Sequence, residues 1–323
     1  MTSQKTTVRF ITCHYLKRND EFRRIWGHDF ELFKNHMAFL KQKYPPVPFS
    51  IIRKYMQGDN ISLPEQCSVI TFDDSLKEQA EVISPYLADQ NISGVFNLST
   101  CIFENEPLTP QVVHFGTAYY GVRKFFSLLS MYLGEVGIEK NDYQRMGENY
   151  IDIYDLHRKI KRFLKYDLSG RDERVLLMHI WNNHLVKDVP DIMQKVYMSK
   201  QDVRNLINMG HEIGCHTHTH PLINDQTFNK QIMEEEIKKP KRILEEITEK
   251  VVDIFAYPYA KKEDILFNKE NINSVRSLGF DILFTIYDTG SKKIDKNYVG
   301  RYSSQSTDSI DDLEKNSWGY EIV

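Results

Sequence analysis

Short apolar runs alternate with longer amphipathic segments along most of the chain. Residues 7–13 form a run typical of a strand, and residues 29–42 carry apolar side chains at helical spacing. The segment 43–49 interrupts regular structure, because its three prolines remove backbone donors and fix φ. Further strands are predicted at 67–72, 93–99, 211–216, 253–257, 281–286 and 299–303, and further helices at about 76–90, 199–209, 228–249 and 271–278.

This alternation predicts the fold class. Strands that alternate with helices pair in parallel through helical crossovers, which gives a layered α/β sheet or a barrel. With about seven such strands, we favour a distorted, partly open (β/α) barrel of parallel strands. In such barrels the chemistry lies on loops that leave the carboxyl ends of the strands.

Residues 104–195 depart from the alternation. Their pattern is aromatic and helical, at 116–137, 150–168 and 174–185. We interpret 104–195 as a helical insertion or lid, with 1–103 and 196–323 forming one discontinuous barrel domain. Its aromatic stripes indicate a core of its own rather than a ligand site.

Composition narrows the possible functions. Hydrophobic residues make up 41% and charged residues 27% of the 323, and 42 Lys and Arg against 45 Asp and Glu give a net charge of −3. A nucleic-acid binder needs a basic surface to displace counterions, so we expect no nucleic-acid partner. No apolar run approaches the roughly 18 residues of a transmembrane helix, and no secretory signal is visible, so we expect a cytoplasmic protein. The oligomeric state is left open.

The four cysteines do not form a recognisable pair. Cys13, Cys67, Cys101 and Cys215 are scattered, without a CxxC spacing. They are too few for a disulfide scaffold or a thiolate zinc site, so we expect free thiols.

Two adjacent carboxylates end the second predicted strand. Asp73 and Asp74 lie in TFDDS at 71–75. Neighbouring side chains on a strand point to opposite faces, but this restriction relaxes at a strand-to-loop junction. One aspartate could there bind a cation while the other handles a proton. An Asx turn or a helix N-cap would explain the same two residues.

Three alternating histidines follow the strand predicted at 211–216. His216 and His220 are four residues apart, which on a helical turn places both imidazoles on one face. With one aspartate they would form a three-ligand, mixed nitrogen and oxygen site with room for water, the pattern of a catalytic zinc site. His218 would point elsewhere on such a turn, as a polar supporting residue or as a further ligand.

Three motifs together resemble the polysaccharide deacetylase (NodB-homology) family of carbohydrate esterases. They are TFDDS at 71–75, GHEIGCHTHTHP at 210–221 and FAYPYA at 255–260, in the order and spacing of that family. The resemblance covers about residues 7–103 and 196–303.

The resemblance implies a metal-dependent hydrolase that removes an N-acetyl group from an amino sugar or glycan precursor. Asp74, His216 and His220 match the metal ligands of the family, for zinc or, alternatively, cobalt, nickel or manganese. Asp73 matches the catalytic base that accepts a proton from the attacking water. The backbone N–H of Tyr259 matches the donor to the oxyanion, held in place by the preceding proline.

The amine leaving group also needs a proton donor. No histidine follows His220, so the late histidine motif of many family members is absent. A permuted branch, similar to the poly-N-acetylglucosamine deacetylases, draws its acid from the first strand, where this chain has His14. Histidine can exchange protons near neutral pH, which suits a general acid. An ordinary histidine at a strand end is the alternative.

Several residues differ from the family pattern. Ser75 and Ala260 replace glycines, so we expect local differences in two loops that favour unusual backbone angles. Ala256 replaces an arginine that orients the base aspartate in many members. Arg301 could fill that role, or could be a surface or salt-bridged arginine.

The motifs do not identify the sugar. An N-acetylated sugar, a nucleotide sugar and a glycan precursor all remain open. The basic run at 158–165 could contact a phosphate or could be a solvated helix face. The alternative functions are a deformylase or other sugar amide hydrolase, and a carbohydrate-binding pseudoenzyme.

Overall fold

The computed structural model describes residues 5–137, 152–259, 268–288 and 290–322, and within them nine strands form one sheet. The strand order is β7-β6-β5-β4-β3-β2-β1-β8, and β9 pairs with β1. The strands are β1 (Thr6–Cys13), β2 (Gln66–Asp73), β3 (Gly94–Leu98), β4 (Glu212–Cys215), β5 (Ile254–Ala256), β6 (Ile282–Thr285), β7 (Val299–Gly300), β8 (Tyr302–Ser303) and β9 (Tyr320–Ile322).

The sheet closes almost completely on itself. Every pair along the order from β7 to β8 is parallel, whereas β9 is antiparallel to β1. The edge strands β7 and β8 are separated along the chain by Arg301 alone, so the two edges meet within one residue. The predicted run 299–303 therefore supplies both edges. The prediction of a distorted, partly open barrel of parallel strands is confirmed.

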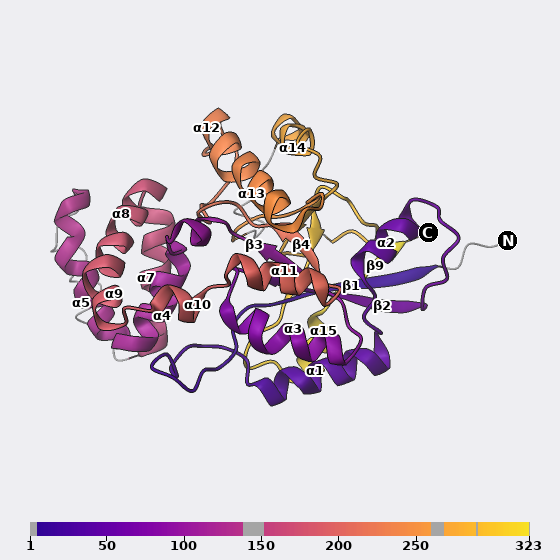
Figure 1. Ribbon diagram of the computed structural model, residues 1–323, viewed down its shortest axis with the longest axis horizontal. Helices are drawn as coiled ribbons and strands as arrows, with labels where there is room; N and C mark the ends of the chain where they lie inside the picture. Colours follow the sequence, from indigo (N-terminus) through magenta and orange to yellow (C-terminus); the bar gives the residue numbers. More distant parts are fainter. Residues whose placement is uncertain (1–4, 138–151, 260–267, 289, 323) are drawn as a thin grey trace.

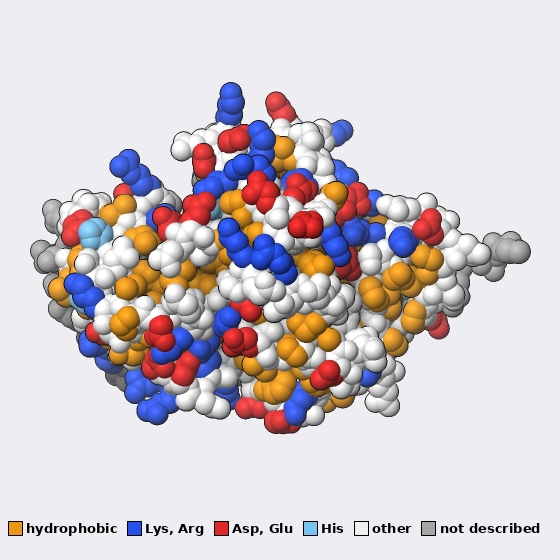
Figure 2. Space-filling view, viewed as in Figure 1, with side chains coloured by type: hydrophobic (Ala, Val, Ile, Leu, Met, Phe, Trp, Pro, Cys, Tyr) orange, Lys and Arg blue, Asp and Glu red, His pale blue; other side chains and the backbone are white. Residues whose placement is uncertain are grey.

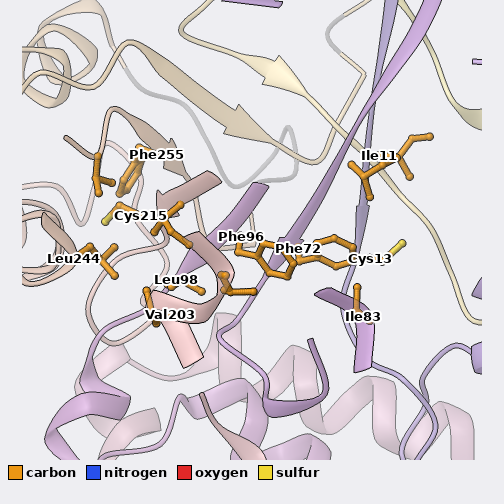
Figure 3. Packing of buried hydrophobic residues seen from close by; sticks show 14 of the residues in the cluster. Ile11, Cys13, Phe72, Ile83, Phe96, Leu98, Val203, Cys215, Leu244 and Phe255 are labelled. Carbon is orange, nitrogen blue, oxygen red and sulfur yellow. The ribbon is translucent and has the colours of Figure 1, made fainter. Parts of the chain in front are cut away.

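Helices cover the outside of the strands. In Figure 1, α1, α3 and α15 lie below the strands, α11 lies at the level of the strands, and α12, α13 and α14 lie above them. The bounds are α1 (Phe30–Lys43), α3 (Ser84–Asp89), α11 (Lys200–Asn208), α12 (Lys230–Ile232), α13 (Lys239–Thr248), α14 (Lys269–Arg276) and α15 (Ile310–Asn316). Phe72 and Phe96 of the strands lie in one apolar cluster with Ile83, Val203 and Leu244 of the helical segments (Figure 3).

Some helices differ from the predicted ones. The helix predicted at 228–249 consists of α12, a π-helical segment (Met233–Lys238) and α13. The helix predicted at 76–90 contains a π-helical segment (Gln79–Ile83) directly before α3. The apolar pattern does not predict α2 (Phe49–Met56), which follows Pro48 directly. Proline is tolerated there because a helix start leaves its first backbone donors unpaired anyway.

Alternation along the strands decides which side chains reach the interior of the barrel. In β2, Ile70 and Phe72 belong to the outer cluster, whereas Val69 belongs to a separate inner cluster. Successive side chains on a strand point to opposite faces, so Thr71 and Asp73 share the inward direction of Val69. The carboxyl end of β2 therefore delivers Asp73 to the interior.

Aromatic side chains fill much of the inner cluster. Phe10 of β1, Phe49 of α2 and Phe284 of β6 meet one another with ring-centroid separations of 5.8, 5.6 and 5.5 Å. These separations suit edge-to-face and tilted ring packing. Helix α2 therefore contributes to the barrel interior, although it lies outside the predicted alternation.

The described chain between β3 and β4 is mostly helical and has its own apolar cluster. Phe115, Phe125, Leu177 and Trp181 are buried in it, together with Phe22 from the loop after β1. In Figure 1 these helices stand at the end of the molecule opposite the termini. They are α4 (Thr109–Tyr120), α5 (Val122–Tyr132), α7 (Ile153–Arg162), α8 (Gly170–Ile180), α9 (Val186–Asp188) and α10 (Ile192–Val196). We propose that 104–195 is a helical insertion into the barrel domain.

Gly121 divides the helical run predicted at 116–137. It separates α4 from α5 with a φ of +81°, a conformation that glycine adopts readily. The two helices also approach closely, since a Cβ on Gly116 would lie 2.3 Å from the Phe125 ring. Residues 138–151, which include the start of the predicted run 150–168, lie outside the described residues.

Two further expectations concern single features of the chain. All four cysteines are free and buried, as expected. In the described part of the chain, no helix is both long enough and apolar enough to cross a membrane.

Candidate active site

Asp73 is held at the end of β2 by two polar side chains, which together donate three hydrogen bonds to it. Arg301 donates from Nη1 to Asp73 Oδ1 and from Nη2 to Oδ2, both at 2.8 Å. Asn97 of β3 donates from Nδ2 to Oδ1, also at 2.8 Å. Arg301 is completely buried, which excludes the alternative that it is a surface arginine. It also donates a hydrogen bond to Thr71 Oγ1. A bidentate arginine fixes both the position and the direction of a carboxylate.

These partners keep Asp73 ionised. Burial alone raises the pKa of its carboxyl group, but the charges of Arg301 and His216 and the arginine hydrogen bonds lower it overall, well below its usual range. Asp73 is therefore an oriented anion. Its Oδ2 also lies 3.8 Å from Nε2 of His14, at the end of β1.

The backbone turns sharply after Asp73. Asp74 and Ser75 both have left-handed backbone angles, with φ of +79° and +59°. Such angles are costly for residues other than glycine, and surrounding bonds must stabilise them. The Ser75 hydroxyl donates to the Ser99 carbonyl oxygen and accepts from the Ser99 N–H. The expected local difference at Ser75 therefore takes the form of a serine held in a glycine-like conformation.

The two outer histidines converge on Asp74. His216 Nε2 lies 3.6 Å and His220 Nε2 3.4 Å from Asp74 Oδ1. The rings of the two histidines are 4.9 Å apart. The expectation that a helical turn aligns them is wrong: they are joined by an irregular loop, in which Thr217 and His220 have φ of +66° and +65°. The loop brings the rings together by left-handed turns instead.

The donor set fits a divalent metal ion. Among the described residues, Asp74, His216 and His220 are grouped with ligand atoms within 4.8 Å of one another. Asp74 Oδ1 is buried and has no hydrogen-bond partner among the residues that the structure describes. His216 Nδ1 lies 2.7 Å from the Ala256 carbonyl oxygen, which favours a proton on Nδ1 and a lone pair on Nε2. Two imidazoles and one carboxylate are typical ligands of catalytic zinc.

The pKa directions agree with a cluster of interacting charges. Burial raises the pKa of Asp74, but His216 and His220 lower it overall, well below its usual range. Burial lowers the pKa of His216, but the charges of Asp73 and Asp74 raise it overall. The pKa of His220 is lowered by burial, despite Asp74. The carboxylate of Asp74 is thus ionised and available as a ligand.

His218 points away from this cluster. Its Nδ1 lies 2.8 Å from Thr100 Oγ1, and its Nε2 lies 2.8 Å from Lys239 Nζ. This arrangement favours the supporting role over ligation. The loop is further held by Glu236, whose carboxylate accepts hydrogen bonds from the backbone N–H groups of His218 and Thr219.

A cavity of about 620 Å³ brings the sequence-predicted site residues together. Its lining includes His14, Asp73, Asp74, His216, His220 and Tyr259. The ring of Tyr259 packs edge-on against His220 at 4.8 Å, and Tyr259 has a φ of +63°. Ala260, the second departure from glycine, lies outside the described residues.

Two residues that support the site, Asn97 and Glu236, were not predicted from the sequence. Asn97 could have been identified, because it is a polar amide within the apolar run 93–99. Its side chain passes so close to Gly214 that a Cβ there would lie 2.1 Å from Asn97 Oδ1. Glu236 could not have been identified, because nothing in the sequence distinguishes it from the adjacent Glu234 and Glu235, which are exposed.

Comparisons with known proteins agree with the motifs. Residues 182–283 match the family model of polysaccharide deacetylases. A search of curated protein sequences found no match.

Solved structures resemble the whole chain. The Streptococcus pyogenes deacetylase PplD, solved in complex with acetate, is 12% identical, with a TM-score of 0.56, and the match covers 97% of this chain and 98% of that one. A de-N-acetylase from Aggregatibacter actinomycetemcomitans is 16% identical, with a TM-score of 0.57 and coverage of 96% and 99%. IcaB from Ammonifex degensii is 14% identical, with a TM-score of 0.51 and coverage of 96% and 98%. At these identities the likeness establishes the fold.

The motifs, the family model and the fold point to the same family. The family model spans the histidine motif at 210–221 and the strand that leads to Tyr259. The aspartate motif lies outside the matched segment, but the structure brings it to the same cavity. The resemblance to the polysaccharide deacetylase family is therefore confirmed: residues 182–283 match its model, and the chain has the fold of solved deacetylases.

Proposed function

We propose that the protein is a metal-dependent hydrolase that removes the N-acetyl group of an amino sugar. The observation that carries the proposal is one cavity that holds both an arginine-bound carboxylate, Asp73, and the Asp74, His216 and His220 cluster. Hydrolysis of an amide needs water activation, oxyanion stabilisation and protonation of the amine. The cavity lining offers a candidate group for each.

Asp74, His216 and His220 would hold the metal ion. A divalent cation there supplies Lewis acidity, which lowers the pKa of water towards about 7 and polarises a carbonyl oxygen. We propose zinc, with cobalt, nickel or manganese as alternatives, since imidazole suits all of these transition metals.

Asp73 acts as the general base. Its carboxylate is ionised and rigidly oriented, so it can accept the proton that the attacking water loses. Arg301 is the positioning residue that keeps Asp73 in place. It takes over the role of the arginine that Ala256 replaces.

His14 and Tyr259 complete the reaction. The backbone N–H of Tyr259 donates to the carbonyl oxygen as negative charge develops there. His14, which lies 3.8 Å from Asp73 and is partly exposed to the cavity, donates a proton to the leaving amine. The carbon–nitrogen bond breaks, the water oxygen remains on acetate, and the sugar is released as a free amine.

The first experiment measures acetate release from N-acetylated sugars, nucleotide sugars and chitooligosaccharides. The protein is tested with added zinc or cobalt, with a chelator, and as Asp73→Asn. Asp311→Asn, a change of the same kind at an exposed position, is the matched control. We expect release that requires metal and is lost in Asp73→Asn but not in Asp311→Asn.

Other outcomes would favour the alternative functions. Release of formate but not acetate from the corresponding formamido sugars would indicate a deformylase. Metal and sugar binding without hydrolysis of any acylated sugar would indicate a carbohydrate-binding pseudoenzyme.

The role of His14 has its own test. An aryl acetate ester has a leaving group that needs no proton, whereas the amine of an acetamido sugar does. We expect His14→Gln to lower acetate release from the sugar about 10²- to 10⁴-fold and to affect the ester much less. Equal losses on both substrates would contradict the general-acid role.

A further inference from the structure

A row of cations lines one wall of the active-site cavity. It consists of Arg158, Lys161 and Arg162 of α7, and Lys165 of the π-helical segment that follows (Phe163–Asp167). Elsewhere the charges are mixed: Figure 2 shows acidic and basic side chains interspersed over the face seen there, and the net charge is −3. We call these four residues the cationic wall.

Helical periodicity explains why the four cations share a side. Residues three or four apart lie on the same face of a helix, and 158, 161, 162 and 165 have this spacing. On the same helix, Leu156 and Ile160 are buried in the apolar cluster of the helical insertion. The apolar face of α7 therefore holds the helix in place while its basic face borders the cavity.

The cationic wall reaches the candidate catalytic residues. Lys165 Nζ lies 4.3 Å from the centre of the Tyr259 ring, and that ring lies 4.8 Å from the ring of His220. Lys161 Nζ lies 3.3 Å from Nε2 of His114, which also lines the cavity. A group bound by these lysines would thus adjoin the bond to be hydrolysed.

Aromatic rings line the same cavity. Trp26 stacks on Tyr154 at 5.3 Å and meets the edge of His157 at 4.1 Å. Tyr15 stacks on His114 at 4.9 Å. All five rings are cavity-lining residues, and they offer apolar surface to the body of a sugar.

Asp155 of α7 pairs with Arg158 at 2.6 Å but does not line the cavity, and few carboxylates do. Besides Asp73 and Asp74, Glu173 is the acidic residue among the described residues that line the cavity. Asp73 is neutralised by Arg301, and Asp74 faces two histidines. Burial raises the pKa of Glu173 to about 7, which further reduces negative charge at the wall. The cationic wall therefore carries a clear positive excess.

We propose that the substrate is an N-acetylated amino sugar that carries a phosphoryl group, and that the cationic wall binds this group. The proposal rests on the proposed deacetylase function and specifies its substrate class. Even with Arg158 paired to Asp155, the cations of the wall exceed the single charge of a sugar carboxylate, whereas a phosphate monoester or a diphosphate carries about two or more negative charges. Arginine and lysine are the side chains that recognise phosphate best.

The test compares substrates that differ in the phosphoryl group. Acetate release is measured with N-acetylglucosamine 1-phosphate, with a uridine diphosphate N-acetyl sugar, with a short-chain lipid diphosphate N-acetyl sugar, and with the uncharged methyl glycoside. The three phosphorylated substrates distinguish a free sugar phosphate, a nucleotide and a lipid carrier as the source of the group. A glycoside with a carboxylate in place of the phosphate tests whether any anion suffices.

The variant pairs Lys161→Gln with Arg162→Gln. Its matched control is Lys159→Gln, which lies on α7 but outside the cavity lining. Each lost charged contact costs about tenfold or more in affinity, so the ratio of kcat/KM for phosphorylated over uncharged sugar should fall about 100-fold in the double variant. The fall should appear in KM. The kcat/KM ratio of the parent protein should shrink at high salt, because salt screens the charges. The Lys159→Gln control should keep the kcat/KM ratio of the parent.

Two results would overturn the proposal. One is a parent enzyme that hydrolyses the uncharged or carboxylate sugar as well as the phosphorylated ones. The other is a double variant whose kcat/KM ratio equals that of the parent.

Failure of the proposed function looks different. In that case no substrate releases acetate. The inference is then decided by calorimetry, which measures how tightly the parent protein and the double variant bind the uridine diphosphate N-acetyl sugar. Weaker binding in the double variant supports the cationic wall as a phosphate site, and equal binding overturns it.

Discussion

The two walls of the candidate active-site cavity are built in opposite ways. On the barrel side, Asp73 and Arg301 are 2% and 0% exposed and are joined by a bidentate ion pair. On the helical side, the side chain of Arg158 is 81% exposed, and Tyr154 is 68% exposed. In the proposed mechanism, the barrel wall holds the reacting groups in fixed positions, whereas the helical wall presents long side chains that can adapt to a ligand.

The difference follows from the two kinds of secondary structure. A strand places alternate residues inside the barrel, so the groups at strand ends are committed to the interior and must be paired. An amphipathic helix buries one face and leaves the other to solvent. Changes in the barrel wall should therefore remove activity, and changes in the helical insertion should alter substrate binding or stability.

The largest effect is expected for Asp74→Asn. It removes the anionic ligand, so zinc content should fall from stoichiometric to near zero, and acetate release should fall at least about 10³-fold. Asp73→Asn is the matched comparison, because it should lose activity but keep its zinc. Both are checked by elemental analysis and acetate assay. Full zinc occupancy in Asp74→Asn would contradict the ligand assignment.

Arg301→Met should cost both stability and activity. It leaves Asp73 as an unpaired buried carboxylate, and breaking a buried ion pair costs about 3–5 kcal/mol in the free energy of unfolding. Urea denaturation measures this loss, and kcat should fall with zinc content unchanged. Arg242→Met, at an exposed position on α13, should change stability by at most about 0.5 kcal/mol. Equal stability of the two variants would show that the Asp73 pair is dispensable.

Leu177→Ala tests the helical insertion. Leu177 is completely buried in its apolar cluster, so the truncation should lower the free energy of unfolding by about 2–5 kcal/mol. Zinc content should remain at the parent level, while KM rises as α7 loosens. The control is Val175→Ala on the same helix, where the side chain is exposed. Loss of zinc in Leu177→Ala would contradict the independence of the two walls.

The smallest effect concerns pH. Burial, reinforced by Lys161, lowers the pKa of His157 to about 3. Between about pH 6.5 and pH 3 the unfolded chain binds a proton that the folded chain does not, so stability falls as the pH falls. This group should contribute a loss of about 2 kcal/mol between pH 7 and pH 5.

His157→Phe should lack that contribution while keeping an aromatic ring beside Trp26. Urea denaturation of parent and variant at pH 7 and pH 5 gives the difference in slope. Identical pH dependence in the two proteins would contradict the lowered pKa of His157.

The alternation of apolar runs was sufficient to predict the barrel and most of its strands. Each run obeys a local rule, since a buried strand must be apolar whatever surrounds it. The same pattern failed for α2, α15 and β9. These are short elements whose stability comes from contacts made by distant segments, such as Phe49 with Phe10 and Phe284.

The motifs marked the candidate site, but only the fold explains its geometry. The spacing of His216 and His220 suggested a helical turn, whereas left-handed residues in the loop align the two rings. Left-handed angles at Thr217 depend on bonds to the rest of the loop, which spacing does not encode. Glu236 supplies such bonds from a helical segment whose sequence looks uniformly solvent-exposed.

The sequence by itself determined the class of fold, the carboxylate and histidine motifs and the basic run at 158–165, because these depend on residue type and local period. Tertiary structure decided how they combine. It paired Arg301 with Asp73, since closing the barrel brings two residues more than 200 positions apart into contact. It also turned the basic run towards the cavity, because the apolar face of α7 had to meet the core of the helical insertion. Long-range packing fixes such relations, and no local pattern records them.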